Sequence, residues 1–310
     1  MIEAVHVGLR GSGVIGSPDV AARLRSRDIA DFDTRYIPPR EGLVWAQPQS
    51  LVQFSQVAAQ TVAASSVQAP ATRELALLAA DVYHDVSIPP AGYRVATDAD
   101  LGRLGLKPQD LTSSQSAFRA RVYVKGANES AEFVVAFRGS TSSTDWQANL
   151  RQGVGLSSDH YTRALIIGRA LARNPQAHVT ITGHSLGGGL ASAAAIASGR
   201  DATTFNAAGL SNATITRANT IRSAAGIGRA AQVQAFYVRG EVLSAIQDGG
   251  DRVIGAIFGG VAGAAIADAP AAYGTRHAFT AVRPVGQPWY SDNPVAKHGM
   301  DWVLSSLGIR

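Results

Sequence analysis

The chain of 310 residues contains no cysteine. Disulfide bonds, thiolate nucleophiles and cysteine-based zinc sites are therefore excluded, and the usual marker of redox compartment is missing. Lysine is also scarce, since only three of the 28 basic residues are lysines and the arginines are scattered along the chain. The net charge is +5, but no basic stripe with interleaved aromatic residues is present. The sequence thus predicts no nucleic-acid partner.

Long hydrophobic runs are missing as well. Residues 1–16 contain no basic segment followed by an apolar core, so we expect no secretory signal. The most apolar stretch, Val253–Ala267, is shorter than the ~20 residues that a bilayer span requires. We therefore expect a chain that is made in soluble form and is exported, where it is exported, without a cleavable signal.

Motifs for cofactors and metals are missing too. The sequence has no P-loop, no Rossmann glycine pattern and no H-E-x-x-H, and its carboxylates are too dispersed for a metal site. We predict neither a cofactor nor a metal.

Glycine is abundant, and Gly187–Gly189 follow a serine where the pattern otherwise indicates a helix. Glycine in a helix interior costs on the order of 1 kcal/mol relative to alanine, so this run needs a physical reason.

Strand and helix patterns alternate from residue 73 onward. Helices are expected over 73–83, over 161–175 and from the glycine run to about Ser198, strands over 133–137, 177–183, 202–209 and 232–240, and a hairpin over 118–139. This alternation predicts a mostly parallel central sheet with helices on both faces. Residues 1–72 are only weakly periodic. We predict a weakly structured or core-packed lead-in over 1–72 and an α/β domain over 73–310.

The pentapeptide Gly183–Gly187 reads G-H-S-L-G and matches the G-x-S-x-G pattern of a nucleophile elbow. It lies between a predicted strand and a predicted helix, as such an elbow requires. The sharp turn strains the serine backbone and needs small residues two positions before and after it. The helix start must pass close to neighbouring strands and leave its first amides open to an oxyanion. We predict Ser185 as nucleophile, and His184 as structural because adjacent residues on this turn point apart.

A second stretch, Val134–Leu150, places an apolar strand directly before Arg138-Gly139-Ser140. The hydroxyl and amide of Ser140 are predicted to donate to the same oxyanion as the amide of Leu186. The pattern F-R-G-S … D-W followed by G-H-S-L-G-G resembles the class 3 lipases over roughly Leu75 to Leu307.

The resemblance to class 3 lipases implies an α/β-hydrolase fold, a Ser–Asp–His triad and an oxyanion-binding serine or threonine that matches Ser140. The lack of a signal and the tail NPVAKHGMDWVLSSL look more like bacterial lipase effectors delivered by type VI secretion. That second resemblance implies non-Sec export to a target cell. It also implies a cognate inhibitor (immunity) protein as a partner.

The acid partner is expected after a strand later than the serine, because α/β-hydrolases follow the order Ser, acid, His. Glu241 stands at the end of the strand predicted over 232–240, where the family has an aspartate. The chain departs from the family here, although a glutamate can orient an imidazole as an aspartate does. Asp248 and Asp251 are rivals, and the strand-end position favours Glu241.

The base is expected after the acid, which leaves His277 and His298. His298 precedes a helix-like apolar segment near the chain end, where the catalytic histidine loop of a hydrolase belongs. His277 begins an alternating segment and is interpreted as strand-edge structure. An imidazole suits the role of general base at neutral pH, and His298 is the prediction.

The leading hypothesis is a serine esterase that hydrolyses lipid esters, of lipase or phospholipase A type, through an acyl-enzyme. We expect a lipid or phospholipid substrate at a membrane surface. Two alternatives stay open: a serine acyl hydrolase with a non-lipid substrate, and a non-catalytic hydrolase-like module that binds a membrane or partner. The apolar segment Val253–Ala267 lies between the proposed acid and base. It is predicted either to line or cover the acyl site or to pack as core.

Overall fold

A seven-stranded sheet organises the computed structural model, which describes residues 72–141, 158–247 and 270–309. The strands are β1 (Tyr93–Val95), β2 (Ala120–Lys125), β3 (Glu132–Phe137), β4 (His178–His184), β5 (Ala202–Phe205), β6 (Val233–Val238) and β7 (Thr275–Phe279). They lie in the sheet in chain order. The β1–β2 and β2–β3 pairs are antiparallel, and every later pair is parallel. The predicted mostly parallel sheet is confirmed.

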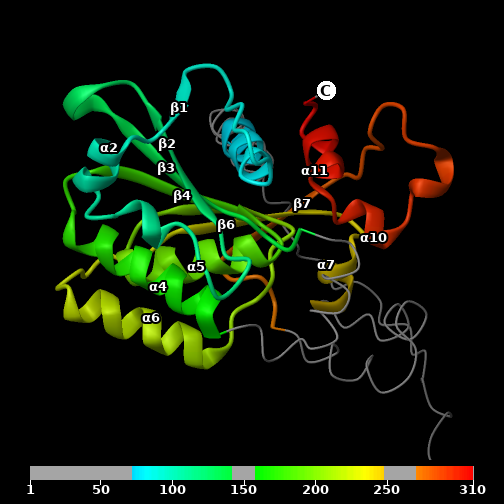
Figure 1. Ribbon diagram of the computed structural model, residues 1–310. Helices are drawn as coiled ribbons and strands as arrows, with labels where there is room; N and C mark the ends of the chain where they lie inside the picture. The colour runs from blue at the N-terminus through cyan, green and yellow to red at the C-terminus, as the bar shows by residue number, and fades with distance from the viewer. Residues whose placement is uncertain (1–71, 142–157, 248–269, 310) are drawn as a thin grey trace, which may run out of the picture. The chain divides into compact units, whose positions relative to one another are not determined.

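Helices cover both faces of this sheet, as predicted. They are α2 (Asp98–Arg103), α4 (Ser158–Arg173), α5 (Leu186–Ser198), α6 (Asn212–Ala224), α7 (Val242–Gln247), α10 (Pro294–Lys297), α11 (Met300–Ser306) and a helix over residues 72–81. Figure 1 shows α4, α5 and α6 on one face and the 72–81 helix with α11 on the other. The topology is that of an α/β-hydrolase with an antiparallel β1–β3 meander at one side.

Strand β3 shows why its sequence is a continuous apolar run. Phe133, Val135 and Phe137 face the cluster formed with α4 and α5. Val134 and Ala136 face the opposite cluster, which contains the buried side chains of the 72–81 helix and α11. Because alternate side chains point to opposite faces, a strand covered on both faces must be apolar throughout.

The expected element boundaries differ from the observed ones at several ends. The hairpin is confirmed as β2 and β3, but β5 ends at Phe205 because Asn206 adopts a positive φ of 42°. Helix α6 was not predicted, since its polar sequence buries mainly Ala218 and packs its two isoleucines against the α4–α5 side. The predicted lead-in over 1–72 and the apolar segment 253–267 lie outside the described residues, apart from Thr72.

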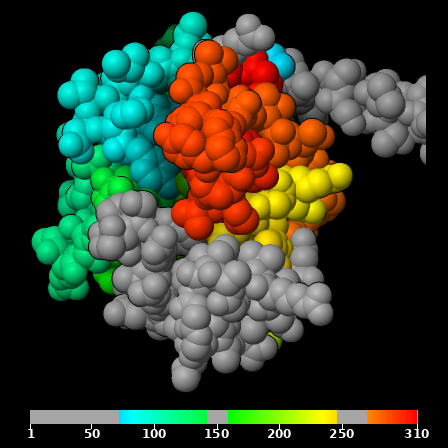
Figure 2. Space-filling view, turned by 90° about the vertical axis from the view of Figure 1, so that its right-hand side faces the viewer, coloured from blue at the N-terminus to red at the C-terminus, as the bar shows by residue number. Residues whose placement is uncertain are grey.

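The carboxyl ends of the parallel strands meet at one edge of the sheet, where β4 and β6 are followed by α5 and α7. Figure 2 looks onto this side, where the C-terminal segment in orange and red lies beside the yellow α7. Across the described ranges, no helix is both long and apolar enough to cross a membrane.

Candidate active site

Ser185 occupies a sharp turn between β4 and α5. Its backbone has φ 58° and ψ −128°, a region that residues other than glycine rarely adopt. The turn is held by the Ser185 amide, which donates to the Phe205 carbonyl (3.0 Å), and by the Ser185 carbonyl, which accepts from the Gly188 amide (2.9 Å). The side chain is 8% exposed. Strain of this kind is retained where the surrounding structure enforces it, most often at functional sites.

The glycines around this serine are explained by close backbone contacts. A Cβ on Gly183 would overlap the carbonyl of Gly187, and a Cβ on Gly187 would overlap the Phe137 carbonyl at the end of β3. A Cβ on Gly188 would lie 2.6 Å from the Ala207 Cβ. The first turn of α5 therefore lies directly against the ends of two neighbouring strands, and larger residues would force the backbone apart.

His298 joins Ser185 to Glu241. Its Nε2 lies 2.9 Å from the Ser185 Oγ, and its Nδ1 lies 2.8 Å from the Glu241 Oε2. His298 is 5% exposed and Glu241 is fully buried. A carboxylate can only accept, so Nδ1 carries the proton and Nε2 is the acceptor for the serine hydroxyl. This is the tautomer that a general base needs.

Glu241 is held by the first turn of α7. It follows Gly240, whose φ of 78° turns the chain out of β6. Its Oε2 accepts from the Leu243 amide (2.9 Å), and its Oε1 accepts from the Ser244 amide (2.5 Å) and the Ser244 hydroxyl. These donors fix the carboxylate and let a glutamate take the place where the resemblance led us to expect an aspartate.

Ser140 follows a glycine that lies against Ser185, and Leu186 directly follows Ser185 in the sequence. A Cβ added to Gly139 would lie 3.2 Å from the Ser185 Cβ, so the residue before Ser140 is in contact with the serine. Leu186 is the first residue of α5, where backbone amides have no intrahelical acceptor. Both predicted oxyanion donors therefore come from segments that touch Ser185.

The rejected histidines make other contacts. His277 Nε2 bonds to the Gln234 Oε1 (2.6 Å) and its ring stacks on Phe236, with centroids 4.8 Å apart. The ring nitrogens of His184 face the Tyr83 hydroxyl and the His298 carbonyl instead of Ser185. The rival acids Asp248 and Asp251 lie outside the described residues. Within the described part of the chain, no group of three or more His, Asp or Glu side chains is arranged to hold a metal ion.

Asn206 is a contributor that sequence reasoning missed. Its Nδ2 donates to the carbonyls of His298 (2.9 Å) and Lys297 (3.2 Å), and its Oδ1 accepts from the Val238 amide (2.9 Å). It thus ties the end of β6 to the histidine loop. The available signal was an asparagine directly after the short strand A-T-T-F, inside the range 202–209 that the sequence predicts as a strand.

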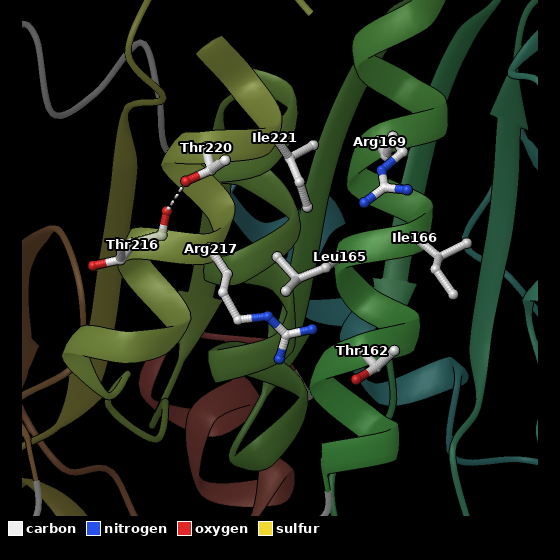
Figure 3. A pocket seen from close by; sticks show the side chains of 8 residues that line it. All are labelled: Thr162, Leu165, Ile166, Arg169, Thr216, Arg217, Thr220 and Ile221. Atoms are coloured by element: carbon white, nitrogen blue, oxygen red, sulfur yellow. Dashed lines mark hydrogen bonds between the residues drawn. The ribbon is translucent and has the colours of Figure 1, made fainter. Parts of the chain in front are cut away.

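A shallow groove lies elsewhere, between α4 and α6 (Figure 3), with a volume of about 280 Å³. It is lined by Thr162, Leu165, Ile166, Arg169, Thr216, Arg217, Thr220 and Ile221. None of these side chains is a carboxylate or a histidine. The groove therefore lacks the acid and base that the strained serine has.

A serine on a strained strand-to-helix turn, at the carboxyl edge of a mostly parallel sheet and bonded to a histidine, defines the α/β-hydrolase class. A comparison with known protein families identifies one family within that class. A family model described as a Tle-like phospholipase domain matches residues 74–284, and the chain belongs to this family. The match includes Ser185 and Glu241 but ends before His298.

Known proteins resemble the chain to different degrees. It is 30% identical over 234 residues to the extracellular phospholipase A1 of Serratia liquefaciens, covering 75% of this chain and 69% of that protein. The crystal structure of Lip2 lipase from Yarrowia lipolytica aligns with a TM-score of 0.34 and 14% identity, over 55% of this chain and 70% of that one. The expectation of a lipase or phospholipase is confirmed through the family.

Proposed function

We propose that this phospholipase is a serine esterase of the A type, in which Ser185, His298 and Glu241 form the catalytic triad. The observation that carries the proposal is the continuous hydrogen-bond chain from the strained serine through the imidazole to the buried carboxylate. The assignment of Ser140 and the Leu186 amide as oxyanion donors rests on the contact between Gly139 and Ser185 and on the start of α5.

The proposed reaction proceeds in two halves. Ser185 Oγ attacks the ester carbonyl while its proton passes to His298 Nε2, and the resulting oxyanion accepts from Ser140 and the Leu186 amide. Collapse breaks the bond to the alcohol, which leaves as lysophospholipid with the proton from His298. A water molecule then gives a proton to His298 and attacks the acyl-enzyme, releasing the fatty acid and restoring Ser185. Glu241 orients the imidazole and stabilises the imidazolium.

The proposed substrate is a glycerophospholipid cleaved at the sn-1 ester. The name of the Serratia relative supports this position. The net charge of +5 would favour a surface that carries anionic lipids. Export by type VI secretion and a cognate inhibitor protein stay predictions from the sequence.

The test uses vesicles of a phosphatidylcholine with different acyl chains at sn-1 and sn-2, and mass spectrometry of the released fatty acids. We expect early release of the sn-1 chain by the wild type and only background release by Ser185→Ala. Release of the sn-2 chain would contradict the A1 assignment while leaving the esterase intact. Turnover of neither chain, together with turnover of a soluble ester, would favour the non-lipid alternative.

A further inference from the structure

A second hydrogen-bond chain runs behind the proposed triad. The Gly139 amide donates to the Tyr83 Oη (3.0 Å), the Tyr83 Oη lies 2.8 Å from the His184 Nδ1, and the His184 Nε2 lies 2.7 Å from the His298 carbonyl oxygen. His184 is 6% exposed, and Tyr83 is half-buried. These hydrogen bonds join four segments of the protein: the ends of β3 and β4, the turn after the 72–81 helix, and the loop between α10 and α11.

The direction of every hydrogen bond in this chain is determined by the groups involved. The His298 carbonyl can only accept, so His184 Nε2 carries a proton. Burial, assisted by the nearby His298, lowers the pKa of His184 to about 3, so the ring is neutral and its Nδ1 is an acceptor. Tyr83 must then donate to Nδ1 while its oxygen accepts from Gly139. In this one arrangement the Tyr83 hydroxyl, the His184 ring and the His298 carbonyl each have a hydrogen-bond partner.

We propose that Tyr83 and His184 are positioning residues that hold the His298 loop and the Ser140 loop in fixed relation to Ser185. This inference rests on the proposed function. His298 is anchored through its backbone carbonyl, which accepts from both His184 Nε2 and Asn206 Nδ2. At the other end of these hydrogen bonds, the Tyr83 hydroxyl fixes the Gly139 amide, one residue before the proposed oxyanion donor Ser140.

The physical basis is that the two loops come from distant parts of the sequence, around residues 139 and 298, and are joined through Tyr83 and His184. Short-range geometry between nucleophile, base and oxyanion donors controls the rate, and small displacements reduce it strongly. His184 follows the strand directly and precedes the nucleophile, so it moves with Ser185. His184 therefore bonds to the His298 loop directly and is linked to the Gly139 amide through Tyr83, so both loops are set against the nucleophile.

The first experiment replaces Tyr83 with phenylalanine, which keeps the ring and removes only the hydroxyl. Tyr93→Phe is the matched control, because it also removes the hydroxyl of a half-buried tyrosine. Tyr93 lies on the distant strand β1, and its hydroxyl donates to the Glu74 Oε2 (3.0 Å). With a soluble short-chain ester, kcat of Tyr83→Phe should fall on the order of 10-fold while KM changes less than about 2-fold. Tyr93→Phe should keep the wild-type kcat.

Active enzyme in each preparation is counted by titration with a serine-reactive phosphonate, so a loss of folded protein does not count as a loss of kcat. Labelling of Ser185 in the wild type tests the proposed function by itself. If Ser185 is labelled and the two phenylalanine variants have equal kcat, the positioning role is wrong although the esterase stands. If the wild type labels elsewhere, the proposed function fails first.

A second measurement needs no variant. Nitrogen-15 NMR of the His184 ring should show a protonated Nε2 and an unprotonated Nδ1 that stay unchanged from neutral pH to pH 5. The opposite tautomer, or a ring that titrates within this range, would overturn the hydrogen-bond directions on which the proposal depends. A variant that folds poorly therefore leaves the proposal testable.

Discussion

The carboxyl edge of the sheet and the groove between α4 and α6 are opposite kinds of site. At the edge, Ser185 and its histidine and glutamate partners are almost completely buried and every reactive group has a hydrogen-bond partner. The groove is open, with Leu165 and Ile221 between the two helices and Arg169 and Arg217 beside them, and Ile166 on α4 is 45% exposed (Figure 3). The groove is lined by no histidine or carboxylate, whereas the edge holds the serine, histidine and glutamate of the proposed triad.

The arrangement of reactive side chains therefore identifies the candidate active site better than the concavity of the surface does. The edge is built from the ends of separate strands, so that strain, burial and complementary donors coincide at one serine. The groove is formed by two neighbouring helices whose buried Leu165 and Ala218 belong to one hydrophobic cluster, and it needs no functional explanation. Substitutions at the two places should therefore differ by several orders of magnitude in their effect on activity.

The largest effect is expected for Ser185→Ala. Ester turnover should fall on the order of 10⁴–10⁶-fold, to the background left by the oxyanion donors, because the nucleophile is removed. The melting temperature should stay near that of the wild type. Steady-state kinetics and thermal unfolding on the same sample check both statements. Substantial remaining turnover would mean that another group is the nucleophile.

Glu241→Gln should follow, with a loss on the order of 10³–10⁴-fold in kcat, because an amide no longer enforces the His298 tautomer.

His277→Gln is the matched control for the base assignment, since His277 bonds to Gln234 outside the site. It should retain activity, whereas His298→Ala should lose nearly all. A greater loss in the His277 variant would reverse the choice between the two histidines.

Ser140→Ala should lower kcat on the order of 10²-fold, because a hydroxyl donor to the oxyanion acts mainly in the transition state. KM for a soluble ester and the melting temperature should change little. Kinetics at saturating ester give the measurement. An unchanged kcat would remove the hydroxyl of Ser140 from the mechanism and leave only its backbone amide as a candidate.

Acid should destabilise the edge through His184. Burial lowers its pKa from 6.5 to about 3 in the folded chain, so between these values the unfolded chain binds a proton that the folded chain does not. The contribution to the free energy of unfolding is therefore present above pH 6.5 and is lost as the pH falls toward 3. Urea unfolding should show a shallower pH dependence for His184→Gln than for the wild type. Equal slopes would contradict a buried neutral imidazole.

The smallest effect is expected in the groove. Ile166→Ser combined with Arg169→Gln should change kcat/KM for a soluble ester by less than about 2-fold, because surface substitutions away from a site rarely matter more. Both side chains line the groove and neither contacts the triad. A loss comparable to that of Ser140→Ala would remove the contrast between the two regions.

Much of the fold was predictable because its signals are local. The alternation in β2, the apolar run of β3 and the amphipathic α4 each follow from side-chain periodicity within a few residues. Helix α6 was not predicted because little of its sequence is apolar, and the burial of its side chains depends on neighbouring helices that the local sequence does not specify. Strand β5 was predicted too long because Asn206 breaks it with a backbone conformation that propensity does not encode.

The sequence by itself was enough to predict Ser185 as the nucleophile and the order in which its acid and base should follow. Gly183 and Gly187 approach each other across the turn itself, so this part of the pattern is visible without a fold. The contacts of Gly187 with Phe137 and of Gly188 with Ala207 belong to the tertiary structure. Only the tertiary structure brought His298 to Ser185, 113 residues away, and Glu241 to His298, 57 residues away. Tyr83 and His184 lie 101 residues apart and carried no signal of their contact. Such pairs meet because parallel strands end at one edge, and strand register, not local sequence, decides which side chains face each other there.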